Sequence, residues 1–462
     1  MRGHPDLVLF MTDQQRFDQV GYASEGHFET PNIDQLAARG VIFEQAYSAS
    51  TTCVPARVAL LTGLQPHRVP TQVNRFALRE GFWTVARALR DAGYETALIG
   101  KMHFAPVHAQ HGFDTMRLCE HLRMQEQVPQ RNDGDVFDDY HDWLLATGLD
   151  DWRFEGSSRP RGGSFPYAIG VHPTGWVERE ALQFLERRDS RRPLFLIVSF
   201  PHPHAPYNPP EPYASMYKPA DSKLPKSGFE INDRLPQAFR NAMTQFGKRR
   251  VPRVDPDTEQ PLRKFLATIR GLVRHIDDAV GCILKQLDLT HTVVFFTSDH
   301  GDYAGHRGLL YKTPWLPFDD LARVPLIVAG GDVSGPRRQR QLVQNLDFAL
   351  TCLDYAGVPA PSDYDFNGRS LRPLLSGTTA AEDDDRAVFC ATTMGWPMVR
   401  RQRYKYIFNK RSSAKVLFDL ESDPAEHINH WQDPDYALIA DELSAALREE
   451  LERDVMQIAP IL

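Results

Sequence analysis

The fold of this chain is limited chiefly by three continuous apolar runs, at residues 7–11, 194–200 and 292–297. A strand with one wet face alternates apolar and polar side chains, and these runs do not alternate. They are typical of strands covered on both faces, as in a mostly parallel sheet between layers of helices. Segments with helical spacing can supply that cover, at residues 30–40, 82–92, 173–188, 262–287 and 346–356. The sequence therefore predicts an α/β protein, and its 462 residues suffice for one large domain with a smaller one attached.

Residues that can bind a metal ion follow directly after two of these runs. Asp13 and Gln14 follow the first run, and Asp299 and His300 follow the third. In sheets of this class the site lies beyond the carboxyl ends of the strands. An isolated Asp-Gln pair is also common in ordinary turns. Because the arrangement recurs after a second strand, we favour a site at this edge of the sheet.

Two further segments place basic or histidine side chains after strands. Lys101 and His103 follow a strand expected at residues 94–99, and alternate residues of an extended segment point to the same side. After the second apolar run, prolines hold the chain extended around His202 and His204. A lone Lys-x-His is most often solvated surface, and two close histidines also fit a zinc pair. Their position after strands favours a functional interpretation.

A lone cysteine lies at the entry of an expected apolar helix, in the segment Cys53-Val54-Pro55-Ala56-Arg57. Proline suits a first helical turn, because its missing N–H would have no partner there. Free backbone N–H groups at such an end attract anions, and the arginine offers a planar fork of donors for an oxyanion. The alternative is a buried core cysteine, the usual fate of an unpaired one. The segment alone does not decide between the two.

Together these segments resemble the signature of the formylglycine-dependent sulfatases, within the alkaline phosphatase superfamily. In that family a maturation enzyme oxidises the cysteine of Cys-x-Pro-[Ser/Ala]-Arg to formylglycine, and Leu-Thr-Gly follows, as at residues 61–63 here. The Gly-Lys-x-His, Pro-His-x-Pro and Asp-His-Gly motifs and Lys312 then occur in family order. The likeness runs from Asp13 to Glu426. The resemblance implies an alkaline phosphatase-like sheet. Gln14 stands where many members have a second Asp, and in this the chain resembles the branch of the choline sulfatases and phosphonate monoester hydrolases.

The resemblance also implies a particular site. Its metal ligands would be Asp13, Gln14, Cys53 as formylglycine, Asp299 and His300. Its catalytic residues would be Cys53, Arg57, Lys101, His103, His204 (with His202 in reserve) and Lys312. In such a site the lysines and Arg57 contact sulfate oxygens, and His204 assists the leaving alcohol. Oxygen ligands suit Ca²⁺, whereas the His300 nitrogen favours a metal such as Mn²⁺, and Mg²⁺ is a further candidate.

The chain divides into an expected catalytic domain at residues 1–358 and a C-terminal α+β subdomain at residues 359–462. Within the first, we interpret residues 119–164 as an insertion or lid, and residues 215–257 as a variable segment that shapes the pocket. The subdomain is expected to contain antiparallel strands and then a helix, at residues 387–392, 404–409, 416–420 and 436–453.

Charge and composition narrow the partners. The net charge of −7 with no long basic run argues against nucleic acid, and no apolar run is long enough to span a bilayer. No signal-peptide segment precedes the first strand, so we expect a cytoplasmic location. Five cysteines without a Cys-x-x-Cys pair fit a reducing compartment and argue against a disulfide scaffold or structural zinc site. Relatives in this branch are often dimers or tetramers, which leaves a homo-oligomer open.

Three functional hypotheses follow. The favoured one is hydrolysis of small-molecule sulfate monoesters, with a formylglycine-generating enzyme as the partner during maturation. The second is hydrolysis of phosphonate monoesters or phosphodiesters by the same site, since sulfuryl and phosphoryl groups are similar in size and geometry. The third is a non-catalytic metal-binding relative, or a plain metal phosphatase, with unmodified Cys53. Only the third predicts that Cys53→Ala leaves the function intact.

Overall fold

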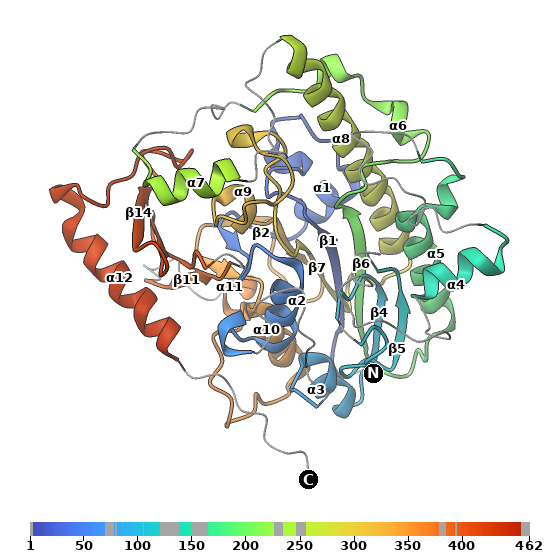
Figure 1. The fold of residues 1–462 in the computed structure, drawn as a ribbon. Coiled ribbons are helices and arrows are strands. Elements are labelled where there is room, and N and C mark those ends of the chain that lie inside the picture. Colours follow the sequence, from blue (N-terminus) through green and yellow to red (C-terminus); the bar gives the residue numbers. More distant parts are fainter. Residues whose placement is uncertain are drawn as a thin grey trace.

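The computed structural model describes residues 3–69, 78, 81–104, 106–120, 138–149, 165–225, 234–245, 256–377, 385–392 and 395–453. The centre of this described part is an eight-stranded sheet with the order β5-β4-β6-β1-β7-β8-β2-β9 (Figure 1). Its strands are β1 (Asp6–Asp13), β2 (Val41–Phe43), β4 (Glu95–Gly100), β5 (Thr115–Leu118), β6 (Leu194–Pro203), β7 (Thr292–Ser298), β8 (Leu326–Ala329) and β9 (Arg337–Gln339). The predicted α/β fold class is confirmed.

Strands β5, β4, β6, β1 and β7 are parallel to one another, and β8 is antiparallel to both β7 and β2. In the centre, Leu9 of β1 pairs with Ile197 of β6 on one side and Phe295 of β7 on the other. The carboxyl ends of β4, β6, β1 and β7 therefore lie side by side at one edge of the sheet. Each of these strands is followed by residues that the sequence assigned to the site.

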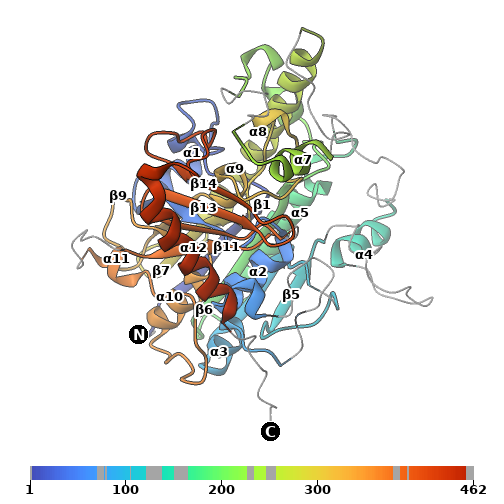
Figure 2. The ribbon, with the colours of Figure 1, turned by 60° about the vertical axis from the view of Figure 1, so that its left-hand side comes forward.

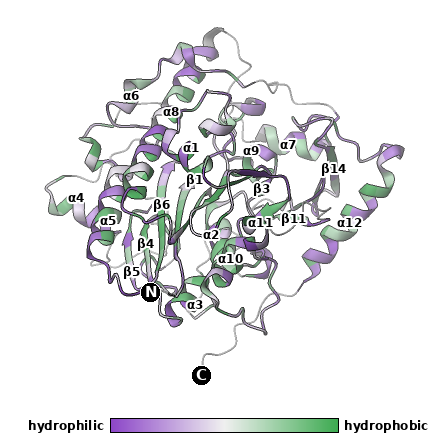
Figure 3. Cartoon of the chain, turned by 180° about the vertical axis from the view of Figure 1, so that it is seen from behind, coloured by the Kyte–Doolittle hydropathy of each residue, from purple (hydrophilic) through white to green (hydrophobic). Residues whose placement is uncertain are grey.

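Helices cover both faces of this sheet, which explains why its strands do not alternate. Leu7, Leu9 and Met11 of β1 pack in a core with α2, α3 and α10, while Val8 and Phe10 pack in a second core with α1, α5 and α8. Figure 3 shows the hydrophobic colour along the strands and mixed colours on the outer helices. These helices are α1 (Pro31–Ala37), α2 (Cys53–Thr62), α3 (Val85–Asp91), α5 (Pro173–Arg187), α8 (Pro256–Leu284) and α10 (Asp347–Ala356).

Shorter elements connect the layers. They are α4 (Asp139–Ala146), α6 (Tyr213–Met216), α7 (Gln237–Gln245), α9 (Asp319–Ala322), α11 (Arg372–Ser376) and the paired strands β3 (Ala46–Tyr47) and β10 (Val343–Gln344). The helix α7 lies within the segment at residues 215–257. The lid interpretation of residues 119–164 stays a prediction, because residues 121–137 and 150–164 lie outside the described part of the chain. The same holds for the pocket-shaping interpretation of residues 215–257, since 226–233 and 246–255 lie outside it.

A four-stranded antiparallel sheet forms the C-terminal part of the chain, with α12 lying across it (Figure 2). Its elements are β11 (Ala387–Cys390), β12 (Met398–Arg401), β13 (Tyr404–Asn409), β14 (Ala414–Asp419) and α12 (Ala437–Glu452). The sequence prediction lacked β12, which joins β11 to β13. On its other face this sheet shares a core with Phe318 and Leu321 of the large domain. The division at residues 358 and 359 stays a prediction.

The path after β4 differs from the expected extended segment. His103 has a φ of 70°, in the left-handed region, so the alternation of side chains does not continue from Lys101. The alternation argument therefore does not apply at His103, although its imidazole lies close enough to Lys101 and Asp13 for their charges to affect its pKa. Within the described ranges, no helix combines the length and the apolar character needed to cross a bilayer. All five cysteines lie in these ranges, and each is a free thiol.

Candidate active site

Four adjacent strands bring the expected site residues to one edge of the sheet. Asp13 is the last residue of β1, and Asp299 and His300 directly follow β7. Lys101 directly follows β4, and His204 directly follows β6. Parallel neighbours end at the same level, so residues distant in sequence become neighbours here.

Cys53 reaches the same edge as the first residue of α2. Thr52 before it is extended (φ −131°, ψ 137°), so the chain turns sharply into the helix at the cysteine. Every residue of α2 is buried, and Gly63 ends the helix with a φ of 68°, where a side chain would collide with Leu350. This buried helix therefore fixes Cys53 at the carboxyl ends of the strands.

The sulfur of Cys53 belongs to a group of four potential ligand atoms. Atoms of Asp13, Cys53, Asp299 and His300 all lie within 4.8 Å of one another, and all four residues are buried. Cys53 Sγ lies 3.1 Å from His300 Nε2 and 3.8 Å from Asp13 Oδ1. His300 Nδ1 lies 2.9 Å from the Gly301 carbonyl oxygen, to which it donates, and this leaves Nε2 as the ligand atom. Two carboxylates and one imidazole nitrogen fit a divalent ion such as Mn²⁺ or Ca²⁺.

Gln14 contacts this group through its backbone. Its φ is 67°, and its backbone N–H donates to Asp299 Oδ1 at 3.0 Å. Its side-chain Nε2 donates to Tyr207 Oη at 2.9 Å and to Asp302. With the amide nitrogen engaged in this way, Oε1 is the atom that can ligate a hard cation. Tyr207 and Asp302 were not among the predicted site residues, although each lies within three residues of a motif histidine.

Two lysines supply positive charge next to the ligand group. Lys101 is fully buried and forms an ion pair with Asp13. Burial disfavours the Asp13 carboxylate, but Lys101 and the other cations outweigh burial and lower its pKa well below the usual range. Lys312 Nζ lies 2.7 Å from Cys53 Sγ and 3.3 Å from His300 Nε2. Burial favours a neutral Lys312, yet Cys53 and Asp13 beside it raise its pKa, so it stays charged.

Arg57 mainly braces the site. Its Nε donates to Asp299 Oδ2 at 2.9 Å, and its Nη1 donates to the Lys101 carbonyl oxygen at 2.7 Å and to Ser199 Oγ at 2.8 Å. Its Nη2 lies 3.6 Å from Asp13 Oδ2 and makes no hydrogen bond within the described residues. The sequence predicted a whole fork of donors for the substrate oxyanion. The structure shows that Nη2 alone is available for that purpose.

The two expected acid–base histidines are neutral. Burial, followed by the charge of Lys101, lowers the pKa of His103 well below its usual value. Burial and Lys312 do the same for His204, whose Nδ1 lies 2.8 Å from the Ala205 carbonyl oxygen. The backbone N–H of His103 donates to Glu120 at 2.8 Å. Glu120 was missed by the sequence reasoning, although it also follows a strand, β5, at the same sheet edge.

His202 belongs to a different set of side chains. Its ring lies 4.5 Å from that of His172, which lies 5.1 Å from His275, and His275 stacks on Tyr213 at 4.5 Å. The four-ligand group found in the described chain contains neither His202 nor His204. The alternative of a zinc pair at these two histidines gains no support. His204 remains the better candidate for the leaving-group role.

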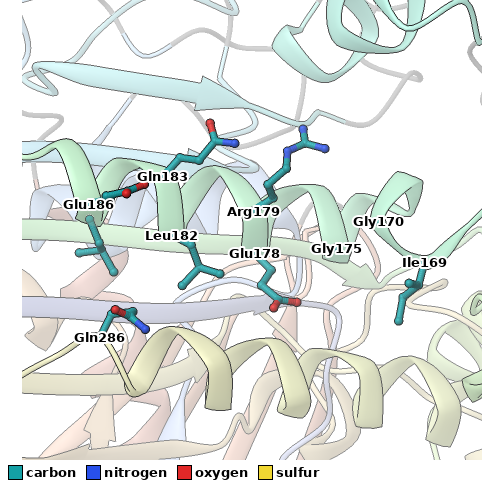
Figure 4. Close-up of a pocket in the computed structure, with 10 residues that line it drawn as sticks. Ile169, Gly170, Gly175, Glu178, Arg179, Leu182, Gln183, Glu186 and Gln286 are labelled. Atoms are coloured by element: carbon teal, nitrogen blue, oxygen red, sulfur yellow. The ribbon is translucent and has the colours of Figure 1, made fainter.

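A pocket of about 800 Å³ lies elsewhere, on the outer side of α5 (Figure 4). It is lined by Glu178, Arg179, Leu182 and Gln183 of α5 and by Gln286 after α8, among others. None of the expected site residues borders it. The chemistry is therefore located by the ligand group and not by this hollow.

The structure combines a nucleophile position at the start of a helix, a metal-ligand group and surrounding cations, all at the edge of a mostly parallel sheet. Together these features define a hydrolase of anionic esters with an alkaline phosphatase-like fold. The family model described as Sulfatase matches residues 5–358, and that described as N-sulphoglucosamine sulphohydrolase, C-terminal matches residues 310–453. The chain therefore belongs to the sulfatase family, whose members hydrolyse sulfate esters. The predicted family is confirmed.

Individual relatives agree over nearly the full chain. An arylsulfatase of Clostridium perfringens is 30% identical, with 97% of this chain and 94% of that protein covered. A choline-sulfatase of Rhizobium meliloti is 28% identical, with 94% and 83% covered. The structure of a phosphonate monoester hydrolase of Agrobacterium radiobacter has a TM-score of 0.76 at 24% identity, with 97% of this chain and 96% of that chain covered. That structural likeness supports the fold.

Proposed function

We propose that this protein hydrolyses sulfate monoesters of small molecules, with Cys53 as the precursor of a formylglycine nucleophile and with one divalent metal ion. The observation that carries the proposal is the position of Cys53. Its sulfur lies 3.1 Å from His300 Nε2 and 2.7 Å from Lys312 Nζ, inside the buried ligand group. A structural core cysteine has apolar neighbours, whereas this one lies among two carboxylates, an imidazole and an ammonium group.

The metal ion, held by Asp13, Gln14, Asp299 and His300, would supply charge that polarises a sulfate oxygen and acidifies the formylglycine hydrate. The cations around Cys53 then bind the remaining sulfate oxygens. Lys312 Nζ lies beside Cys53 Sγ, and Arg57 Nη2 lies 3.6 Å from Asp13 Oδ2. Arg57 is buried and Lys312 is partly buried, and charges shielded from water act strongly. Substrate binding adds negative charge near Lys312, which favours proton uptake by His204 and lets it protonate the leaving alcohol at Nε2. His103 is neutral without substrate and can accept a proton at Nδ1.

The second candidate function is hydrolysis of phosphonate monoesters by the same residues. A multifunctional alkaline phosphatase superfamily protein of Trinickia caryophylli is 28% identical, with 96% of this chain and 94% of that protein covered. The site geometry suits a tetrahedral anion of either sulfur or phosphorus. We place sulfate first because the arylsulfatase and the choline-sulfatase are both sulfate ester hydrolases by name.

The remaining proposals concern setting and partners. We propose a cytoplasmic location, a formylglycine-generating enzyme as the maturation partner, and Ca²⁺ or Mn²⁺, with Mg²⁺ as a further candidate, as the metal. The location rests on five free cysteines, which fit a reducing compartment. The maturation partner rests on the Cys53 motif, and the choice of metal rests on the mixed oxygen and nitrogen ligands.

A paired hydrolysis assay tests the proposed function. Protein produced with a formylglycine-generating enzyme, supplied with Mn²⁺ or Ca²⁺ and checked for Cys53 conversion by peptide mass, would receive an aryl sulfate and an aryl phosphonate monoester. Cys53→Ala is compared with Cys282→Ala, since Cys282 is a partly exposed cysteine on α8. Sulfate preference that disappears only in Cys53→Ala supports the proposal. Phosphonate preference selects the second candidate, and activity that persists in Cys53→Ala refutes the formylglycine mechanism.

A further inference from the structure

A second cluster of buried charges contacts the loop that carries Lys312. Glu426 and Lys405 come from the C-terminal part of the chain, and Arg307, Asp319 and Asp320 come from the large domain. Neither Glu426 nor Lys405 has measurable side-chain exposure. Burying so many charges is costly unless each has a partner, so their arrangement calls for a reason.

Glu426 contacts three different segments through its two carboxylate oxygens. Its Oε2 accepts from Arg307 Nη2 at 2.9 Å and from the Asp319 backbone N–H at 2.9 Å. Its Oε1 accepts from Lys405 Nζ at 2.6 Å. One side chain of the C-terminal region thus holds the start of α9 and the loop before it.

Arg307 is the loop residue in this network. Its Nε donates to Asp320 Oδ2 at 2.7 Å, and its guanidinium lies 3.6 Å from the centre of the Phe318 ring. Arg307 and Glu426 have φ values of 57° and 55°, a conformation that is uncommon for residues other than glycine. Tertiary contacts are needed to hold such a backbone, and the ion pairs supply them.

The anchored loop is the one that delivers Lys312. Its two ends are joined where the Gly301 N–H donates to the Leu321 carbonyl oxygen at 2.8 Å, and a side chain at Gly301 would collide with the Asp320 backbone. Inside the loop, the Tyr303 N–H donates to the Tyr311 carbonyl oxygen at 2.9 Å. Lys312 comes directly after Tyr311 and reaches Cys53, so the position of its ammonium group depends on how the loop is held at Arg307.

We propose that Glu426 is a positioning residue for catalysis, which acts from the C-terminal region through Arg307 to hold the loop that places Lys312 beside Cys53. The large domain alone would then lack a fixed Lys312, and the C-terminal region is a working part of the active site. This inference rests on the proposed function for its kinetic test, and on geometry alone for its structural test.

The experiment compares Glu426→Gln with Glu421→Gln in the full-length, converted, metal-loaded protein. Glu421 is an exposed residue of the same segment and pairs with the half-exposed Arg403. Glu426→Gln keeps the side-chain volume and removes the charge that Arg307 needs. We expect kcat to fall about 10- to 100-fold, as is usual for groups that orient a catalytic site, with a smaller change in KM. Glu421→Gln is expected to match the wild type.

A double-mutant cycle with Lys312→Ala separates positioning from general destabilisation. If Glu426 acts through Lys312, Glu426→Gln has little further effect on kcat once Lys312 is absent. Hydrogen exchange provides a readout without activity, because loss of the anchor should speed amide exchange across residues 301–316. Additive kinetic losses, or unchanged exchange in that segment, overturn the inference. If the wild type hydrolyses none of the esters, the proposed function fails and hydrogen exchange alone decides the role of Glu426.

Discussion

Two buried clusters of charge in this molecule are built from similar residues but are paired differently. Around Cys53, atoms of two carboxylates, the thiol and an imidazole face one another within 4.8 Å, and Arg57 Nη2 makes no hydrogen bond in the described chain. Around Glu426, each oxygen of the carboxylate has a cation or a backbone donor. Incomplete pairing leaves groups ready for a ligand, whereas complete pairing fixes the backbone. The comparison teaches that burial and charge alone do not identify a catalytic site.

The largest expected effect tests the incompletely paired cluster. Cys53→Ala removes the precursor of the proposed nucleophile, and kcat should fall by a factor on the order of 10⁴ or more. The thermal midpoint should change little, because a small apolar side chain replaces a small buried one. Ester hydrolysis and calorimetry measure both, with Cys282→Ala as the control. A large loss of stability in Cys53→Ala would show that this cluster also serves as core.

The next effect tests the completely paired cluster. Lys405→Met leaves the buried Glu426 and Asp319 carboxylates without their shared ammonium group. We expect the free energy of unfolding to fall by about 3–5 kcal/mol, the usual cost of breaking a buried ion pair from one side. Urea denaturation measures it, and Lys410→Met, at an exposed position after β13, is the matched control. A loss of unfolding free energy smaller than that of the control would mean that water reaches the carboxylates of this cluster.

A third prediction concerns metal binding by the first cluster. Wild-type protein should gain about 2.7 kcal/mol of stability when Mn²⁺ is present at 100 times its dissociation constant. Asp299→Asn removes one ligand charge and the ion pair with Arg57, so that gain should disappear at the same concentration. Thermal shift with and without chelator measures it, and Asp288→Asn, an exposed residue before β7, provides the control. An equal metal-dependent shift in Asp299→Asn would place the ion elsewhere.

The sequence located the first cluster far better than the second. Apolar runs that end in Asp13 and in Asp299-His300 identify a sheet edge by local pattern, and the edge then collects the residues after four strands. The Arg307–Glu426 contact joins residues 119 positions apart, and no local pattern encodes such a pair. The positive φ of His103 and the Glu120 contact likewise depend on packing around the strand end. The sequence also could not show which N–H groups of Arg57 bond within the protein and which remain for a substrate. Ser199 and the Lys101 carbonyl oxygen, which accept two of these bonds, are brought to Arg57 only by the folded sheet.

The smallest expected effect comes from His275, a buried side chain outside both charged clusters. Because it is neutral in the folded protein, it serves as a comparison for them. Burial, followed by the nearby His202, lowers the pKa of His275 to about 3 from an ordinary value of 6.5. Below pH 6.5 the unfolded chain binds a proton that the folded His275 refuses, so stability falls as the pH falls towards 3. At pH 5 this amounts to about 2 kcal/mol for one histidine.

His275→Phe keeps a ring beside Tyr213 and removes the titration, so its stability should depend less steeply on pH between 6.5 and 5 than that of the wild type. Urea denaturation at several pH values measures the slope, and His291→Gln, at an exposed position, should leave it unchanged. An identical slope in His275→Phe would mean that this imidazole is charged or hydrated in the folded protein. The adjacent rings of His172, His202 and His275 would then form a third polar cluster that needs hydrogen-bond partners. The distinction between incompletely and completely paired clusters would have to include it.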